Sequence, residues 1–406
     1  MIVDGDGAEI DWHVGYGPPA AKFVEKLDMS ARGIDTTRTL SAQYAENPDD
    51  VSVVFKLAEK YAGRYVEEKT LRALELHRKV ITLDPEGKAG TTEYLGEKVS
   101  YREASAYAAA QLQLFDRGRD IAPMRAFIRD YPESPILKQA CSILGSFYSY
   151  SGSREDATAF FEDYVARYGD DPSALNAYVT RIIRDKGPVD RGIELAEKIR
   201  NLTRINPVPA FAQNLAQLHI LNDEKSKADD VYGRTFIEGR VTGLAWDLAG
   251  FANFWHDRDA NLDAALEMAL TAIRLNPDHP YFLQTAAKLH IKTGNEAEAL
   301  AVYGRRFAST CADKPNDLIS YARFWSGRKT NLESALEAAE KAAELQPQAP
   351  HIQDTLAMVY LALGRKAEAL EAAEKAAALA ADQPGLADFY NQRLAAVKES
   401  IVKKDD

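Results

Sequence analysis

The sequence predicts an all-α chain in which helical hairpins stack into a right-handed α-solenoid, preceded by a short β-hairpin and a helix. Residues 251–277 and 321–347 repeat each other at a constant offset of 70. The equivalent alanines of successive hairpins are Ala265, Ala299, Ala335 and Ala369, which are 34, 36 and 34 residues apart. A pair of helices of this length cannot bury its apolar face alone, so the hairpins must stack.

The first predicted element is a β-hairpin followed by a helix. Residues 2–3 and 10–14 are β-type runs, and the second alternates apolar with polar residues, which is typical of a half-buried strand. Asp4-Gly5-Asp6-Gly7 between them supplies the positive φ of a hairpin turn. The glycines and prolines of residues 15–19 end the second strand. The helix that follows carries Phe23, Val24 and Leu27 on one face.

This order of elements resembles the last quarter of a thioredoxin-like domain, over about 25 residues, and residues 1–28 are interpreted as such a C-terminal remnant. The redox chemistry of that family sits in an N-terminal Cys-x-x-Cys motif, whereas the two cysteines here are Cys141 and Cys311. The resemblance therefore implies the tail of a redox domain whose reactive half is absent, and it carries over no catalytic residue. The alternative is a free β-hairpin and helix packed on another part of the molecule. Such a segment cannot fold alone, so Ile2, Val3 and Trp12 are expected to pack on the array, to pack on another chain, or to stay mobile.

The helical part divides into three predicted regions. Residues 29–134 are expected to form divergent helical repeats, interrupted near 87–100 by a small hairpin or ordered loop that turns at Gly96-Glu97. Residues 135–382 carry the clearest periodicity and form the predicted repeat array. Residues 383–406 are expected to be a capping helix and a tail, because an exposed solenoid end needs a polar cover.

The individual hairpins resemble the tetratricopeptide repeat (TPR), whose pattern places large and small residues at fixed steps of two helices. The closest copy has Leu144, Gly145, Tyr148, Gly152, Ala157 and Phe161. The last copy has Leu356, Ala357, Tyr360, Gly364 and Ala369. Motifs that end in proline close four predicted second helices, at 83–85, 205–207, 275–277 and 345–347. The resemblance implies a non-enzymatic scaffold that binds a protein or peptide.

Charge and composition restrict the class of partner and the compartment. A net charge of −11 argues against nucleic acids and anionic membranes, which bind clustered cations. No apolar run is long enough for membrane insertion, and the start lacks the pattern of a signal peptide. The expected location is cytoplasmic, or periplasmic or exported if an export signal lies upstream. The sequence does not predict an oligomeric state.

No catalytic, cofactor-binding or metal-binding motif is recognised. The seven histidines form no H-E-x-x-H pair, and no phosphate-binding or nucleophile-elbow pattern occurs. A helical-toroid enzyme stays open as an alternative, because it is also built from helical hairpins. The main rival function is different: the array would position substrates for a thioredoxin-family disulfide oxidoreductase whose catalytic half is absent from this chain.

The first helices of stacked hairpins line a concave surface, where a partner is expected to bind. Trp255 and Trp325 are interpreted as inter-repeat core, while Phe254 and Phe324 could belong either to the groove or to the core. The array lacks a convincing lysine-asparagine clamp for acidic C-termini. The predicted binding residues are Phe254, Asp257, Tyr281, Gln284, Lys288, Phe324, Arg328 and Asp354.

Overall fold

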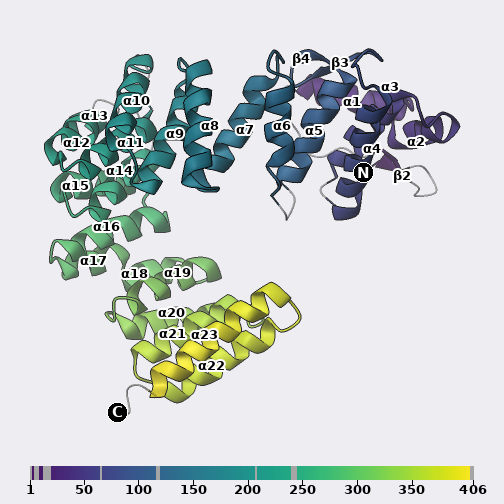
Figure 1. The fold of residues 1–406 in the computed structure, drawn as a ribbon. Helices are drawn as coiled ribbons and strands as arrows, with labels where there is room; N and C mark the ends of the chain where they lie inside the picture. Colours follow the sequence, from purple (N-terminus) through teal and green to yellow (C-terminus); the bar gives the residue numbers. More distant parts are fainter. Residues whose placement is uncertain are drawn as a thin grey trace. The chain divides into compact units, whose positions relative to one another are not determined.

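The fold is an all-α, TPR-like helical solenoid, as the sequence predicted. The computed structural model describes residues 2–3, 9–11, 20–64, 66–115, 119–205, 208–238 and 245–402. They belong to two compact units, Met1–Asn206 and Pro207–Asp406, which are described separately below (Figure 1). The boundaries that the sequence suggests at 28, 134 and 382 stay predictions.

The first unit contains two short β-hairpins and a series of helices. Helix α3 packs on α4, α4 on α5, and α9 on α10, so neighbours in sequence are neighbours in space. Its strands are β1 (Ile2–Val3), β2 (Glu9–Asp11), β3 (Thr91–Tyr94) and β4 (Glu97–Ser100). Its helices are α1 (Ala20–Ala31), α2 (Thr37–Glu46), α3 (Val51–Ala62), α4 (Glu67–Leu83), α5 (Tyr101–Phe115), α6 (Ala122–Asp130), α7 (Leu137–Tyr150), α8 (Arg154–Arg167), α9 (Pro172–Asp185) and α10 (Val189–Leu202).

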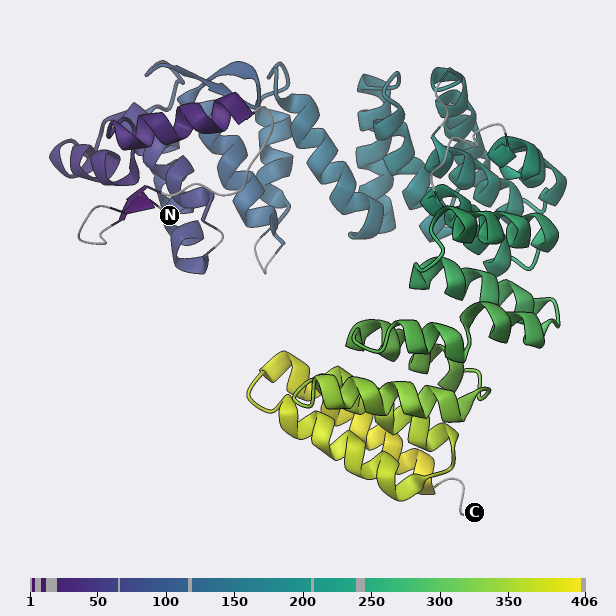
Figure 2. The same cartoon turned by 180° about the vertical axis from the view of Figure 1, so that it is seen from behind.

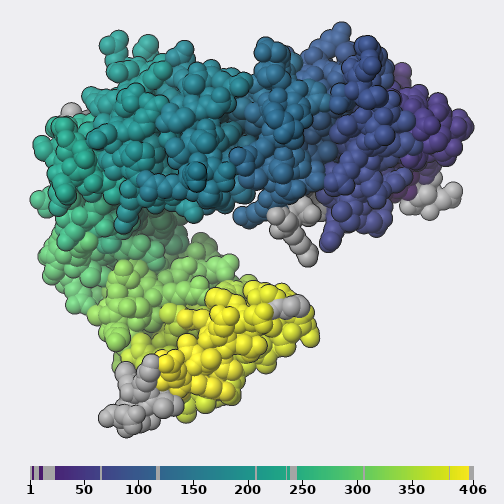
Figure 3. Space-filling model, in the orientation of Figure 1, coloured from purple at the N-terminus to yellow at the C-terminus, as the bar shows by residue number. Residues whose placement is uncertain are grey.

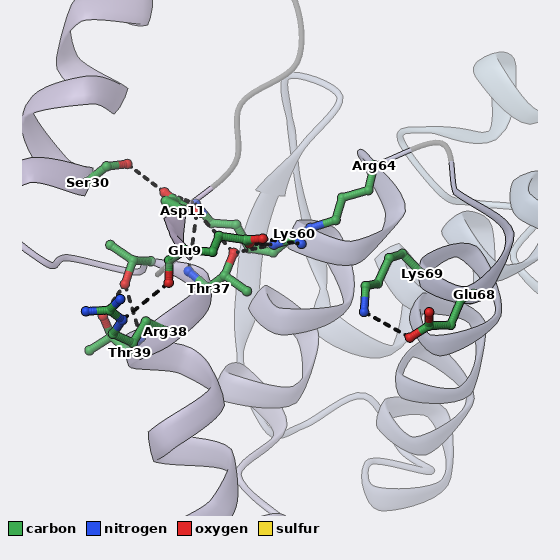
Figure 4. A network of polar contacts seen from close by, with 11 residues as sticks. Glu9, Asp11, Ser30, Thr37, Arg38, Thr39, Lys60, Arg64, Glu68 and Lys69 are labelled. Carbon is green, nitrogen blue, oxygen red and sulfur yellow. Dashed lines mark hydrogen bonds and ion pairs between the residues drawn. The ribbon is translucent and has the colours of Figure 1, made fainter. Parts of the chain in front are cut away.

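The N-terminal hairpin is docked on the helices by two carboxylates of β2, Glu9, which pairs with Arg64, and Asp11, which is buried. Strands β1 and β2 pair antiparallel, and Asp11 at the end of β2 is fully buried. Asp11 accepts hydrogen bonds from Ser30 Oγ at 2.6 Å, from the Thr37 amide at 3.3 Å and from Lys60 Nζ at 2.8 Å (Figure 4). The hydrogen-bond donors to Asp11 thus come from α1, α2 and α3, so the hairpin packs on helices that precede the predicted array of residues 135–382. The predicted turn at 4–7 and Trp12 lie outside the described residues.

A second hairpin interrupts the helices at the predicted place. Strands β3 and β4 pair in register from Thr91 with Ser100 to Tyr94 with Glu97. Its two turn residues, Leu95 and Gly96, both have positive φ, which suits the right-handed twist of a two-residue hairpin. The turn is therefore one residue earlier than predicted. Tyr94 packs edge-on against Phe55 of α3, so the hairpin covers that helix.

The second unit consists of helices alone within its described residues, 208–238 and 245–402. Prolines begin several first helices, because the first helical position needs no amide donor; Pro280, Pro315 and Pro350 are examples. The helices are α11 (Pro209–Leu221), α12 (Lys225–Tyr232), α13 (Arg234–Glu238), α14 (Ala245–Asp257), α15 (Leu262–Leu275), α16 (Pro280–Lys292), α17 (Glu296–Tyr303), α18 (Arg305–Thr310), α19 (Pro315–Ser326), α20 (Leu332–Leu345), α21 (Pro350–Ala362), α22 (Lys366–Leu379) and α23 (Pro384–Val402).

The 70-residue repeat corresponds to two hairpins, of which the first has a broken second helix. The breaks fall at Gly233, between α12 and α13, and at Gly304, between α17 and α18. Each break precedes a tryptophan of the next hairpin: Trp255 Nε1 donates to the carbonyl oxygen of Tyr232 at 2.9 Å, and Trp325 Nε1 donates to that of Tyr303 at 2.8 Å. A continuous helix would use these carbonyls internally, so the break makes them available to the indole groups.

The last helix covers the end of the array. Helices α20 to α23 run side by side, α22 packing against both α21 and α23 (Figure 2). In the space-filling view α23 forms the surface over its neighbours (Figure 3). Arg393 of α23 pairs with Asp354 of α21, with Nε and Oδ1 2.9 Å apart. This contact holds α23 on α21, the first helix of the last hairpin.

Candidate functional site

Three of the eight predicted binding residues are buried, and the prediction that they face a groove is wrong for them. Phe254 and Phe324 are 3% and 4% exposed. Each ring packs edge-on against a tyrosine of the preceding hairpin, Tyr232 at 5.1 Å and Tyr303 at 5.2 Å. Asp354 is 6% exposed because it pairs with Arg393 of α23.

The two phenylalanines are each covered by an arginine one helical turn further on. The Arg258 guanidinium lies 3.7 Å from the centre of the Phe254 ring, and that of Arg328 lies 3.8 Å from the Phe324 ring. Both arginines also donate to the carbonyl oxygen of the phenylalanine beneath. Trp255 and Trp325 are buried, which confirms their interpretation as core. The duplicated Phe-Trp motif therefore packs one hairpin on the next, and an arginine covers the phenylalanine ring in each copy.

The remaining predicted residues lie on the first helices or just after them. Tyr281, Gln284 and Lys288 follow one another along α16, and Arg328 follows the end of α19. We call these four residues the first-helix face. Asp257, at the end of α14, is 70% exposed and accepts a hydrogen bond from His256 Nδ1 at 2.9 Å when that nitrogen is protonated.

Two half-buried cations of this face have no carboxylate within ion-pair distance among the residues that the structure describes: Lys288 and Arg328. Burial lowers the pKa of Lys288, the positive charge of Arg328 lowers it further, and Asp257 raises it. Burial likewise lowers the pKa of Arg328. Both groups thus lose hydration without forming an ion pair with a described carboxylate, and the attraction of Lys288 to Asp257 offsets only part of this loss.

In the preceding pair of hairpins, the residues equivalent to Lys288 and Arg328 are joined by a hydrogen bond. Gln217 of α11 stands where Lys288 stands in α16, and its side-chain oxygen accepts a hydrogen bond from Arg258. Lys288 has no acceptor to offer Arg328. With lysine in place of glutamine, Arg328 lacks the side-chain acceptor that Arg258 has, and two half-buried cations lie near each other.

A cavity of about 540 Å³ lies beside this face, between the first turns of α16 and α19. Tyr303 lines it, is fully buried, and its hydroxyl has no hydrogen-bond partner among the described residues. Trp246 of α14, which does not itself line the cavity and is 59% exposed, stacks on Tyr281 with ring centres 5.2 Å apart. The cavity is lined by His279, Tyr281, Gln284, Tyr303, Lys314 and Asp317, among others.

Sequence reasoning identified Tyr281 and Gln284 but missed the rest of this cavity. Tyr303 of α17 and Asp317 of α19 lie on different helices, and no local pattern brings them together. A signal was present in the repeat itself. Aligning Gln217 with Lys288 and Arg258 with Arg328 would have shown that only one of the two pairs is complementary.

The described residues contain neither a metal-binding cluster nor a membrane-spanning helix. No cluster of three or more His, Cys, Asp or Glu side chains there could hold a metal ion. None of the described helices has the length and apolar character needed to cross a membrane.

Comparison with known proteins agrees with the repeat. Residues 351–383, which contain α22 and all of α21 except its first residue, match the tetratricopeptide repeat family. No curated protein matches the chain.

Three solved structures are similar to the chain. A tetratricopeptide repeat protein from Parabacteroides merdae is 14% identical, with 63% of this chain and 93% of that one covered and a TM-score of 0.37. The Naa15/Naa10 structure bound to HypK-THB is 12% identical, with 96% and 72% covered and a TM-score of 0.43. YrrB, described as a TPR protein with an unusual peptide-binding site, is 12% identical, with 57% and 97% covered and a TM-score of 0.25.

Proposed function

We propose that the protein is a binding scaffold and that its second unit holds an extended segment of a protein partner along the first-helix face. The observation that supports this most strongly is the pair of half-buried cations, Lys288 and Arg328, without an internal carboxylate. An acidic side chain or C-terminal carboxylate of the partner would complete this pair.

The energetic argument is that the free protein carries a cost that a ligand can remove. Partial burial of a charge is unfavourable unless a counter-charge or hydrogen bonds compensate it. An acidic group between Lys288 and Arg328 would supply both, since guanidinium and carboxylate groups form strong paired hydrogen bonds. Lys288 is not needed for the packing of Arg328 on Phe324, because the equivalent position in the preceding hairpin pair carries a glutamine, Gln217, that accepts a hydrogen bond from Arg258.

Replacing Lys288 with Gln should separate binding from stability. We expect the free energy of unfolding to rise by about 0.5–1.5 kcal/mol, because the new amide can accept a hydrogen bond from Arg328 and one unpaired charge is removed. Denaturant unfolding of the full chain measures this. Lys341→Gln is the control, since Lys341 is an exposed residue of the second helix α20 and pairs only with Glu344 at the surface.

The same variant should lose the preference for acidic ligands. Random decapeptides displayed on phage and selected on the full-length protein should share an Asp or Glu at one position, and Lys288→Gln should abolish that preference. Lys341→Gln should keep it. If the wild-type protein selects no peptides, or if Lys288→Gln selects the same acidic peptides, the proposed site is wrong.

A second candidate function is favoured by the order of β1, β2 and α1, which is the strand, strand and helix order of the thioredoxin-like resemblance. In it the helical array would position substrates for a disulfide oxidoreductase domain. The chain itself is expected to show no dithiol oxidoreductase activity, because Cys141 and Cys311 are both buried and burial raises the pKa of each thiol. An insulin-reduction assay checks this. Turnover that disappears in Cys141→Ser or Cys311→Ser would contradict it.

A further inference from the structure

The cavity between α16 and α19 has the chemistry of a site for a positive charge. Asp317 lines it from the first turn of α19, and Asp278 lines it from the loop before α16. Neither carboxylate has an ion-pair partner among the described residues. Lys314 is the one cationic side chain among the residues that line the cavity, so the carboxylates outnumber it.

The helix ends do not reverse this preference. Two helices, α16 and α19, begin at the cavity, and the N-terminus of a helix favours negative charge. Asp317 already occupies the first turn of α19, and Asp278 lies directly before α16. The partial positive charges of both helix ends therefore have acidic neighbours within the protein. The cavity groups that still lack a partner are hydrogen-bond acceptors.

The Tyr303 hydroxyl is an independent indication of a ligand. The Tyr303 side chain lines the cavity and is fully buried, and no described residue forms a hydrogen bond with its hydroxyl. Burial raises the pKa of Tyr303 and the charge of Asp317 raises it further, so the hydroxyl is neutral and lies within the electrostatic reach of this carboxylate. A buried polar group without a partner is costly, and a donor in the cavity would satisfy its oxygen.

The rim of the cavity suits a planar cation. Tyr281 lines the cavity and is exposed, and Trp246, which lies outside the lining, holds its ring by stacking on it with an interplanar angle of 29°. Guanidinium groups stack on such aromatic faces and donate through five N–H groups at the same time. Asp317, the Tyr303 oxygen and the Gln284 side-chain oxygen can accept from one guanidinium, whereas a carboxylate ligand would meet two carboxylates of its own charge.

The distance along α16 sets the spacing of the two sites. Tyr281, Gln284 and Lys288 lie on one side of the helix, at steps of three and four residues. Lys288 is four to seven residues beyond the cavity wall, which is about 6–10 Å along a helix axis. An extended segment advances about 3.3 Å per residue, so this distance spans about two or three residues of a ligand.

We propose that this cavity binds a basic side chain, preferentially arginine, of the same partner segment whose acidic residue pairs with Lys288 and Arg328, two or three residues away. This inference rests on the function proposed above and adds the charge pattern of the ligand. The partner is a protein segment that carries one basic and one acidic residue at this fixed spacing.

The phage selection described above tests both sites in separate arms. Peptides selected on the wild-type protein should carry Arg or Lys two or three positions from the acidic residue. Asp317→Asn should remove the basic preference and keep the acidic one, whereas Lys288→Gln should do the reverse. Asp313→Asn is the matched control, because Asp313 is exposed and does not line the cavity.

Synthetic versions of one selected peptide give the magnitude. Replacing its arginine by citrulline, which keeps the shape but removes the charge, should weaken binding to the wild-type protein about tenfold and binding to Asp317→Asn much less. Tyr303→Phe keeps the buried ring and should weaken arginine peptides about threefold with no loss of thermal stability. Acidic peptides without a basic residue at fixed spacing, or citrulline peptides that bind as well, would overturn the cavity assignment and leave the acidic site standing. Failure to select any peptide would overturn the proposed function itself.

Discussion

Replacing Lys60 with Met should detach the N-terminal hairpin from the first unit. Asp11 is 0% exposed, and Lys60 Nζ lies 2.8 Å and 2.9 Å from its two oxygens. Breaking a buried ion pair from one side costs about 3–5 kcal/mol, since the remaining charge stays in a poorly hydrated place. We expect the amides of β2 and α1 to lose at least two orders of magnitude of protection against hydrogen exchange.

Two further variants check this mechanism. Lys56→Met removes a neighbouring pair, with Asp35, whose side chains are 42% and 37% exposed, and it should cost less than about 1 kcal/mol. The double variant Asp11→Asn with Lys60→Met should recover protection, because it removes the buried charge together with its partner. Equal protection in Lys60→Met and the wild-type protein would show that the ion pair does not hold the hairpin.

Replacing Gly304 with Ala should produce the largest loss of stability in the second unit. A Cβ atom at this position would lie 2.1 Å from the carbonyl oxygen of Leu300, which belongs to the backbone of α17. The backbone must move to relieve the clash, and the bond between Trp325 Nε1 and the Tyr303 oxygen moves with it. We expect a loss of about 2–3 kcal/mol in denaturant unfolding.

Gly250→Ala provides the matched control for this change. Gly250 lies in α14 with no atom within 4 Å of the added Cβ, so alanine should be neutral or stabilise the helix by up to about 1 kcal/mol. Gly233→Ala should resemble Gly304→Ala, because its Cβ would lie 2.2 Å from the Asp229 carbonyl oxygen. A Gly304→Ala variant as stable as Gly250→Ala would mean that the helix break is not required.

The sequence predicts the helical hairpins well because their signals are local and repeated. Proline begins first helices, alanine recurs at close helix contacts, and a β-hairpin is detected near Leu95 from its glycine and flanking β-type residues. Trp255 and Trp325 are correctly placed in the core, since large aromatic residues at equivalent repeat positions usually fill the space between hairpins.

The errors arise where a contact depends on distant parts of the chain. Phe254, which the sequence left open between groove and core, is buried against Tyr232 of the preceding hairpin, at the end of α12. Asp354 is buried because Arg393, 39 residues later, reaches back to it. The cavity beside Tyr303 could not be predicted from the sequence for the same reason, since its walls come from separate hairpins.

The broken helices also determine how many hairpins this chain can gain or lose without losing a Trp–carbonyl hydrogen bond. Trp325 takes its acceptor from the hairpin before it, so the smallest piece that contains both partners is a pair of hairpins, about 70 residues long. When a whole pair of hairpins is gained or lost, each tryptophan indole still lies opposite a backbone carbonyl that a helix break leaves without an internal donor. Loss of a single hairpin would place α21, which has no tryptophan, after α18 and leave the Tyr303 carbonyl without its donor. Insertions and deletions within the second unit should therefore preserve the fold when they add or remove an even number of hairpins.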